Sequence, residues 1–287
     1  MNSAQFDLSL VMDAVRVTEA AAIASWTLAG RGDEKEADRA AVEAMRDTLN
    51  SLNIEGRIVI GEGERDEAPM LFIGEKLGKG SGPKIDIAVD PLEGTTLTAK
   101  SMANALAVMA WAPEGTLLNA PDTYMDKIAV GPGLPAGIID LDKSAAENVS
   151  AIAKAKGVSV TEITACVLDR PRHAEIIASL RAAGARVALI SDGDVAGVIN
   201  TTDPSTGIDF YMGQGGAPEG VLACAALADI EVDAGGRLGG VDHSGDVAVG
   251  DQIDPRADLA QAVDDLTMAR PVEHADRDVG QIGRAHV

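Results

Sequence analysis

The sequence predicts an α/β protein in which a part with a mixed sheet precedes a part with a largely parallel sheet. Residues 85–89 are mainly apolar and rich in β-branched side chains, which suits a buried strand, and they lead directly into a polar turn. Residues 104–112 are rich in Ala, Val and Met and form a second strand candidate. From about residue 145, short strand and helix patterns alternate, which is typical of a parallel sheet covered by helices. We therefore expect one α/β domain over residues 1–144 and another over 145–287.

Composition restricts the partners and the compartment. Hydrophobic residues make up 46% of the 287, enough for a sizeable core, and only 2% are aromatic, so the core is aliphatic. The net charge of −21 argues against nucleic acid or an anionic membrane as the main partner. Cys166 and Cys224 lie in apolar runs and are expected to be reduced core residues. The start of the chain shows no signal-peptide pattern, and no apolar run approaches the roughly 20 residues of a membrane span. These features predict a cytoplasmic protein.

Two helices are expected first. Residues 7–29 follow a helical apolar stripe that ends at Gly30-Arg31-Gly32, and Asp33 is a suitable N-cap for a second helix over 34–52. Asp38 lies one turn before Val42 on the apolar stripe of this second helix. A carboxylate there is costly unless it is paired or bound to a metal. The alternative is a partly solvated first-turn acid that favours the helix dipole, and both readings stay open here.

Two expected strands end in acidic residues. The strand over 57–60 leads into Gly61-Glu62-Gly63, where the glycines let the backbone bend, and a helix is expected over 69–77. The strand over 85–89 is expected to stop at Asp90, because Pro91 lacks an N–H group.

The segment after Asp90 is a candidate metal site. Gly94 permits a tight turn that returns Glu93 and Thr95 toward Asp90. Two hard oxygen ligands beside a hydroxyl can hold Mg²⁺ or Mn²⁺ and orient a water. The alternative is an ordinary acidic turn.

The next segment is expected to form a hairpin and a loop. Residues 116–118 would pair back on residues 104–112 around the turn at 113–115. Tyr124 follows, and a packed loop residue is a commoner role for it than a ligand contact.

In the second half, polar residues cluster where three expected strands end, the edge at which parallel sheets bind ligands. Arg170 and Arg172 suit bidentate phosphate binding or, alternatively, pairs with surface acids, and His173 is expected only to start a helix. The turn over 192–194 either caps a helix or binds sugar hydroxyls.

The third cluster surrounds the start of another helix. The N–H groups of Gly215-Gly216 can face an anion. Glu219 is either a first-turn acid that favours the helix dipole or a metal ligand.

Taken together, these motifs resemble the class II, GlpX-type fructose-1,6-bisphosphatases, including the dual fructose-1,6-/sedoheptulose-1,7-bisphosphatases. The resemblance covers roughly residues 8–240. It rests on motifs in family order: Gly30-Arg31-Gly32-Asp33, Gly61-Glu62-Gly63-Glu64, Asp90-Pro91-Leu92-Glu93-Gly94-Thr95, Pro121-Asp122-Thr123-Tyr124, Arg170-Pro171-Arg172-His173, Asp192-Gly193-Asp194 and Gly216-Ala217-Pro218-Glu219-Gly220. Membership implies the layered α/β sugar-phosphatase fold, which is similar to that of inositol monophosphatases.

The resemblance also implies a set of site residues in a Mn²⁺- or Mg²⁺-dependent phosphoric monoester hydrolase. The implied metal ligands are Asp38, Glu62, Asp90, Glu93 and Glu219. The implied substrate contacts are Glu93, Gly94, Thr95, Tyr124, Arg170, Arg172, Asp192, Gly193, Asp194 and Gly216. Thr95, Asp90 and Glu62 would act in catalysis. The first domain would thus hold the metal, the second domain would bind the sugar phosphate, and the protein would be a homo-oligomer.

The implied reaction is in-line attack of water on the 1-phosphate of fructose 1,6-bisphosphate, which would place the protein in gluconeogenesis. A preference for sedoheptulose 1,7-bisphosphate or another sugar phosphate is the first alternative. The C-terminal part departs from the family pattern, with only a faint echo at residues 264–270. The second alternative is therefore an inactive remnant that still binds phosphosugars, because the missing pattern would leave the second domain incomplete.

Overall fold

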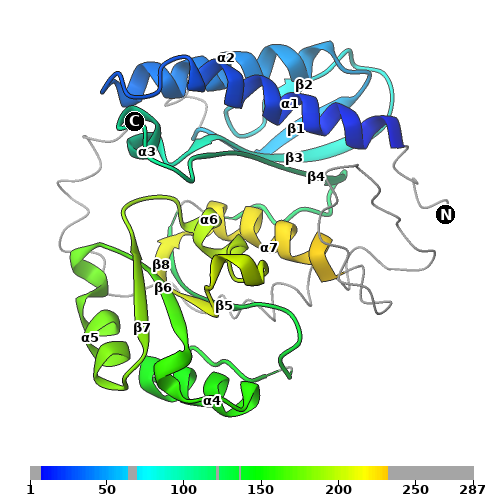
Figure 1. Cartoon of the computed structure of the whole chain (residues 1–287). Coiled ribbons are helices and arrows are strands. Elements are labelled where there is room, and N and C mark those ends of the chain that lie inside the picture. The colour runs from blue at the N-terminus through cyan, green and yellow to red at the C-terminus, as the bar shows by residue number, and fades with distance from the viewer. Residues whose placement is uncertain (1–7, 64–69, 121–122, 136, 232–287) are drawn as a thin grey trace, which may run out of the picture.

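The computed structural model describes residues 8–63, 70–120, 123–135 and 137–231. These residues form alternating layers of helices and sheets (Figure 1). One helix pair covers the outer face of the first sheet, a second pair lies between the two sheets, and a third covers the outer face of the second sheet. The predicted α/β class, with a mixed sheet followed by a largely parallel one, is confirmed.

The outer layer beside the first sheet consists of α1 (Leu8–Trp26) and α2 (Glu34–Ser51). Asp33 caps α2 as predicted, because its carboxylate accepts a hydrogen bond from the Glu36 backbone N–H at 3.0 Å. The apolar stripe of α2, represented by Met45 and Leu49, is fully buried against the first sheet. The stripe thus orients α2 so that Asp38 faces the edge of the core.

The first sheet has the order β2-β1-β3-β4. Its strands are β1 (Glu55–Ile60), β2 (Lys76–Leu77), β3 (Lys84–Glu93) and β4 (Leu106–Pro113). The pair β1/β3 is parallel, whereas β2 and β4 join the sheet in antiparallel orientation. β3 lies between β1 and β4, and its acidic segment extends past its last pair with β1, Ile60 with Ala88, so that β4 alone pairs with it.

The expected end of β3 at Asp90 is wrong, because the strand continues through Pro91 to Glu93. Its pairing with β4 shifts register between Asp90 and Glu93, which marks a bulge. A proline is tolerated at a bulge, since the strand makes no regular ladder bond there. Gly94 then adopts a left-handed conformation, with φ of 87°, and α3 (Thr95–Ala99) begins. Asp90 and Glu93 are therefore held by a strand rather than by a loop.

Two other local predictions are wrong. Residues 116–118 form no strand, and the antiparallel partner of β4 is β3. The helix expected over 69–77 is absent over its described residues 70–77, which form turns and β2. There the buried Glu75 carboxylate accepts hydrogen bonds from the Leu71 backbone N–H and the Arg46 side chain. These bonds stabilise a turn that competes with the helix.

The second sheet has the order β5-β8-β6-β7. Its strands are β5 (Tyr124–Val130), β6 (Thr164–Leu168), β7 (Arg186–Ile190) and β8 (Phe210–Gly216). The pairs β6/β7 and β6/β8 are parallel, and β5 lies antiparallel to β8. Because β5 precedes residue 145, this sheet does not coincide with the predicted domain boundary, which stays a prediction.

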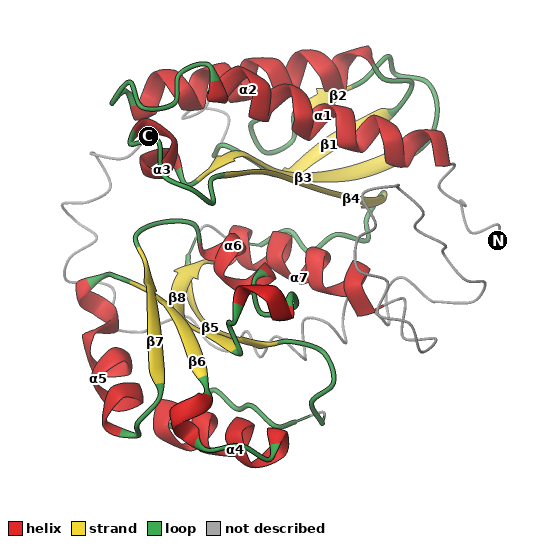
Figure 2. Cartoon of the chain, viewed as in Figure 1, coloured by secondary structure: helices red, strands yellow, loops and turns green. Residues whose placement is uncertain are grey.

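The helices of the second half cover both faces of this sheet (Figure 2). On the outer face lie α4 (Ala145–Lys156) and α5 (Ala174–Ala182), and between the sheets lie α6 (Asp194–Ile199) and α7 (Ala217–Glu231). Three short 3₁₀ helices, η1 (Val160–Glu162), η2 (Pro171–His173) and η3 (Pro204–Thr206), complete the connections. Among the described helices, none is both long and apolar enough to cross a membrane.

One apolar cluster joins the two sheets. It contains Val59, Ile60 and Ala88 from the first sheet and Cys166 and Tyr211 from the second, with α6 and α7 packed between them. Cys166 and Cys224 are both buried and reduced, as predicted. This shared core holds the polar ends of β3, β8 and α6 together. The predicted C-terminal elements, including the pattern at 264–270, lie outside the described residues.

Candidate functional site

Glu93 connects the two halves of the molecule. It lies at the end of β3, is 4% exposed, and its Oε1 atom accepts a hydrogen bond from the Val195 backbone N–H of α6 at 3.0 Å. Its Oε2 atom is buried and has no hydrogen-bond partner among the described residues. A Cβ atom at Gly193 would come within 2.9 Å of this oxygen, so Gly193 makes room for it. One carboxylate oxygen is thus fixed by a hydrogen bond, and the other is buried against Gly193 without one.

The five predicted metal ligands form one electrostatic group. Asp38 comes from α2, Glu62 follows β1, and Glu219 lies in the first turn of α7, with Asp90 and Glu93 on β3. Burial, followed by the charge on Asp38, raises the pKa of Glu62 to about 8. Burial, followed by the Asp194 charge, likewise raises the pKa of Glu93 to about 8.

Asp90 lies at the centre of this group. Loss of hydration raises its pKa most, and the charges of Glu93, Glu62, Glu219 and Asp38 raise it further. Burial also raises the pKa of Asp38. Each of the other four carboxylates therefore influences Asp90, although only Glu93 lies near it in the sequence.

The donor set fits a hard divalent cation. All five side chains supply carboxylate oxygens, which Mg²⁺ and Mn²⁺ prefer. The neighbouring charges that help to raise the pKa values of Glu62, Asp90 and Glu93 show a repulsion that a cation would relieve. Within the described ranges, however, no three acidic, histidine or cysteine side chains are arranged closely enough to enclose an ion. The structure therefore collects the predicted ligands without showing a closed coordination shell.

A buried lysine that sequence reasoning missed lies beside this group. Lys127 on β5 is 1% exposed, and its Nζ atom lies 2.6 Å from Oδ2 of Asp194, which is 7% exposed. Gly215 of β8 permits this contact, because a Cβ atom there would collide with the Asp194 carboxylate. The available signal was a single charge in the alternating apolar pattern of Met125, Lys127 and Ala129, but we had expected no strand there.

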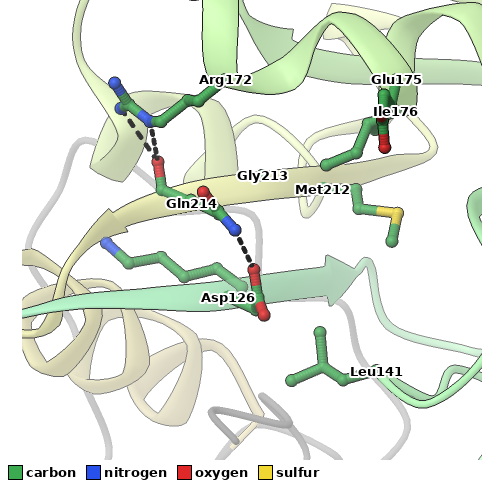
Figure 3. Close-up of a pocket in the computed structure, with 9 residues that line it drawn as sticks. Asp126, Leu141, Arg172, Glu175, Ile176, Met212, Gly213 and Gln214 are labelled. Carbon is green, nitrogen blue, oxygen red and sulfur yellow. Dashed lines mark hydrogen bonds between the residues drawn. The ribbon is translucent and has the colours of Figure 1, made fainter. Parts of the chain in front are cut away.

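The predicted substrate-binding residues lie around the ends of β6 and β8. The guanidinium group of Arg172, in η2, donates to the Gln214 backbone carbonyl at 3.0 and 3.3 Å (Figure 3). It also lies 5.0 Å from the centre of the Tyr124 ring. Arg170 pairs with Asp192 at 3.4 Å, as its alternative role predicted. Tyr124 is exposed and begins β5, so its expected role as a packed loop residue is wrong.

His173 has a larger role than the helix start that we predicted. It is fully buried, and its Nε2 atom accepts a hydrogen bond from the Gln214 backbone N–H at 2.8 Å. Nδ1 must then carry the proton that is donated to the Leu168 carbonyl, also at 2.8 Å. Burial lowers the pKa of His173, which favours this neutral form. The ring thus joins β6 to β8 beyond the last regular pair, Cys166 with Tyr211.

Gln214 is held on three sides. Its N–H donates to His173, its carbonyl accepts from Arg172, and its side-chain amide donates to Asp126 Oδ1 at 2.7 Å. A pocket of about 260 Å³ lies beside it, lined also by Leu141, Ile176 and Met212 (Figure 3). The carboxylate group described above does not line this pocket.

The remaining predicted residues lie at the starts of helices or next to them. Gly94 and Thr95 begin α3, Gly193 precedes α6, and Gly216 ends β8 directly before α7. A Cβ atom at Gly216 would collide with Oε2 of Glu219, so that carboxylate lies against the Gly216 backbone. The structure thus brings the metal-ligand and substrate sets to the same region between the two sheets.

Comparison with known proteins identifies the family of the chain. The sequence profile of the family described as "Bacterial fructose-1,6-bisphosphatase, glpX-encoded" matches residues 8–268, further than the residue 240 that we expected. "Fructose-1,6-bisphosphatase 1 class 2" of Escherichia coli (strain K12) is 52% identical over 229 residues, which cover 80% of this chain and 68% of the relative. "Fructose-1,6-bisphosphatase class 2" of Shigella flexneri shows the same identity and coverage. The chain belongs to the family of glpX-encoded bacterial fructose-1,6-bisphosphatases.

Proposed function

We propose that this protein hydrolyses the 1-phosphate of fructose 1,6-bisphosphate to give fructose 6-phosphate and phosphate, in a reaction that depends on Mn²⁺ or Mg²⁺ and serves gluconeogenesis. Family membership supports the reaction class. The observation that carries the metal dependence is the buried Glu93 Oε2 atom, which lacks a hydrogen-bond partner among the described residues and belongs to a group of mutually repelling carboxylates.

Asp38, Glu62, Asp90, Glu93 and Glu219 would hold the ions. Bound there, the metal would polarise the phosphoryl oxygens, activate a water and stabilise the leaving alkoxide. Thr95, with Asp90 or Glu62 as its acidic partner, would orient the attacking water and accept or relay its proton. The Val195 N–H would keep Glu93 directed at the site, because it occupies the other carboxylate oxygen.

The substrate residues would bind the sugar phosphate across the ends of β6 and β8. Arg172, fixed on Gln214 and Tyr124, would anchor the phosphate that is retained, together with Arg170. The backbone at Gly94 and Gly216 would contact the substrate, and the turn Asp192-Gly193-Asp194 would bind its hydroxyls. The buried Lys127 would keep Asp194 in place for that contact.

Phosphate release from purified protein tests the proposal. We expect release from fructose 1,6-bisphosphate with Mn²⁺ or Mg²⁺ and none with EDTA. Asp90→Asn should abolish release, whereas Glu114→Gln, which removes an exposed acid after β4, should not. Equal release by the wild type and Asp90→Asn would sink the proposed mechanism.

The same assay separates the alternatives. A higher kcat/KM for sedoheptulose 1,7-bisphosphate would change the substrate and keep the enzyme class. Thermal stabilisation by fructose 1,6-bisphosphate without any turnover would instead identify an inactive phosphosugar-binding protein.

Two further statements belong to the proposal. We place the protein in the cytoplasm, which its two reduced, buried cysteines support. We also propose that it is a homo-oligomer, as its family resemblance implies.

A further inference from the structure

The outer helix α1 carries apolar side chains on the face that points away from the protein. Its inner face packs on the core, where Val17 and Ala21 are fully buried. On the opposite face, the following large side chains are exposed by 43, 50, 58 and 75%, respectively: Met12, Val15, Ile23 and Trp26. At 3.6 residues per turn they fall within an arc of roughly 80°. A helix that is apolar on both faces is typical of one that is covered on both.

The spacing of these residues is symmetric about Glu19. Val15 and Ile23 lie four residues before and after Glu19, and Met12 and Trp26 lie seven before and after it. If a second copy of α1 packed antiparallel across a two-fold axis at Glu19, each Trp26 would contact the partner's Met12. In the same arrangement, each Ile23 would contact the partner's Val15. One face would thus complement itself, as a closed two-fold interface requires.

The charges on the face suit the same arrangement. Glu19 lies at the axis, where two carboxylates would approach each other, and the exposed Arg16 lies one turn away beside Asp13. In the antiparallel pair, Arg16 lies on the side of the partner's Glu19, so the two arginines offset the two central carboxylates. A single polar residue in an apolar helix contact also specifies register at some cost in stability. On a chain of net charge −21, an anionic membrane would be a poor alternative occupant.

We propose that α1 forms a two-fold interface between two copies of this chain, with the helices antiparallel and Glu19 at the axis. The proposal rests on the proposed homo-oligomer and adds the surface and the register. Trp26 would be its main anchor, because it is the most exposed large apolar residue of the face and tryptophan is enriched among residues that dominate binding.

Light scattering on the full chain tests the surface. Trp26→Lys places a charge in the apolar contact, and Leu118→Lys is the matched control, because Leu118 is exposed but lies outside α1. We expect the wild type and the control to be dimeric or larger, and the mass of Trp26→Lys to fall about twofold. A variant with wild-type mass would reject this interface and keep the proposed oligomer. A monomeric wild type at every concentration would reject both.

A disulfide tests the register. Two helices packed 8–10 Å apart would place their axial Cα atoms roughly 4–5 Å from each other, close to the range that a disulfide spans. Glu19→Cys should therefore cross-link rapidly under mild oxidation, while the native Cys166 and Cys224 stay buried. Val15→Cys should cross-link slowly alone and rapidly when combined with Ile23→Cys. Cross-linking of Glu19→Cys no faster than that of Leu118→Cys would overturn the antiparallel register.

Discussion

Lys127 and Asp194 form a buried ion pair, with Nζ and Oδ2 2.6 Å apart, between β5 and the first turn of α6. The next residue along α6, Val195, donates its N–H to Glu93. A side chain of the second sheet is therefore connected through α6 to a predicted metal ligand of the first sheet. The pair positions the start of α6. That start carries both the Asp194 carboxylate and the Val195 N–H group, which donates a hydrogen bond to Glu93.

Removing only the lysine should be more harmful than removing both charges. Lys127→Met would leave the Asp194 carboxylate buried without its counter-ion, which we expect to cost about 3–5 kcal/mol of unfolding free energy. The double variant Lys127→Met/Asp194→Asn should recover much of that loss. Urea unfolding of the two variants and the wild type provides the measurement. Equal destabilisation of the single and double variants would show that the lysine stabilises through its packing and not its charge.

Gly216 should be intolerant of a side chain. A Cβ atom there would collide with Oε2 of Glu219, so Gly216→Ala should displace that carboxylate from the metal-ligand group. We expect kcat/KM to fall on the order of 100-fold, the effect of misplacing a catalytic group by about 1 Å. Gly207→Ala is the control, since a Cβ atom there meets no atom within 4 Å and adds only backbone strain from its positive φ of 69°. Similar activities of the two variants would contradict the role assigned to Gly216.

Periodicity and capping predicted the helices and most strands, because those signals are local. The cap at Asp33 and the stripe of α2 needed only residues within a few turns of each other. The prediction of a hairpin after β4 was wrong because strand pairing there depends on a distant part of the chain. The segment that follows pairs instead with β8, about 90 residues away in the chain, through contacts such as Tyr124 with Gly216. Turn patterns at residues 113–115 hold no information about that partner.

The candidate site was predictable only in part. Four of the carboxylates stood out because each lies beside a glycine, a proline or a strand end, and Asp38 stood out on the apolar stripe of α2. Family resemblance then selected among them. Lys127 and His173 did not, since a buried lysine needs its partner Asp194 and a bridging histidine needs two strands in place. The prediction that β3 ends before Pro91 was wrong for a related reason. The rule that proline ends a strand does not apply at a bulge, and the bulge exists only through pairing with β4.

Metal should stabilise the folded protein through the carboxylate group. A ligand that binds only the folded state at 100 times its Kd adds about 2.7 kcal/mol, so Mn²⁺ should raise the Tm of EDTA-treated protein. Glu93→Gln should reduce this rise, because the amide that replaces this predicted ligand cannot ionise to bind the cation. Differential scanning fluorimetry across a Mn²⁺ titration provides the measurement, with Glu114→Gln as the control. A Tm rise in Glu93→Gln equal to that of the wild type would exclude Glu93 from the metal site.

His173 should position the substrate arm rather than take part in chemistry. His173→Asn removes the acceptor of the hydrogen bond from the Gln214 N–H. Without that bond, the Gln214 carbonyl that holds Arg172 is less firmly positioned. We expect KM to rise by about tenfold, equivalent to 1.4 kcal/mol, with kcat largely kept. His173→Gln, which places an acceptor near the same position, should recover much of the loss. A fall in kcat with unchanged KM would instead indicate a role near the reacting phosphate.

The same contact should make the protein sensitive to acid. Burial lowers the pKa of His173 below 6.5 in the folded state, so the unfolded state binds the proton more readily. The contribution of the neutral ring to stability is therefore complete above pH 6.5 and is lost as the pH falls toward the folded pKa. Protonation would also remove the acceptor that Gln214 uses. Arg170 and Arg172, the nearby cations, disfavour the charged ring further. His173→Gln should remove this part of the decline in Tm between pH 6.5 and 5, measured against the wild type in the presence of metal. Parallel Tm curves for the two proteins would mean that another group causes the acid sensitivity.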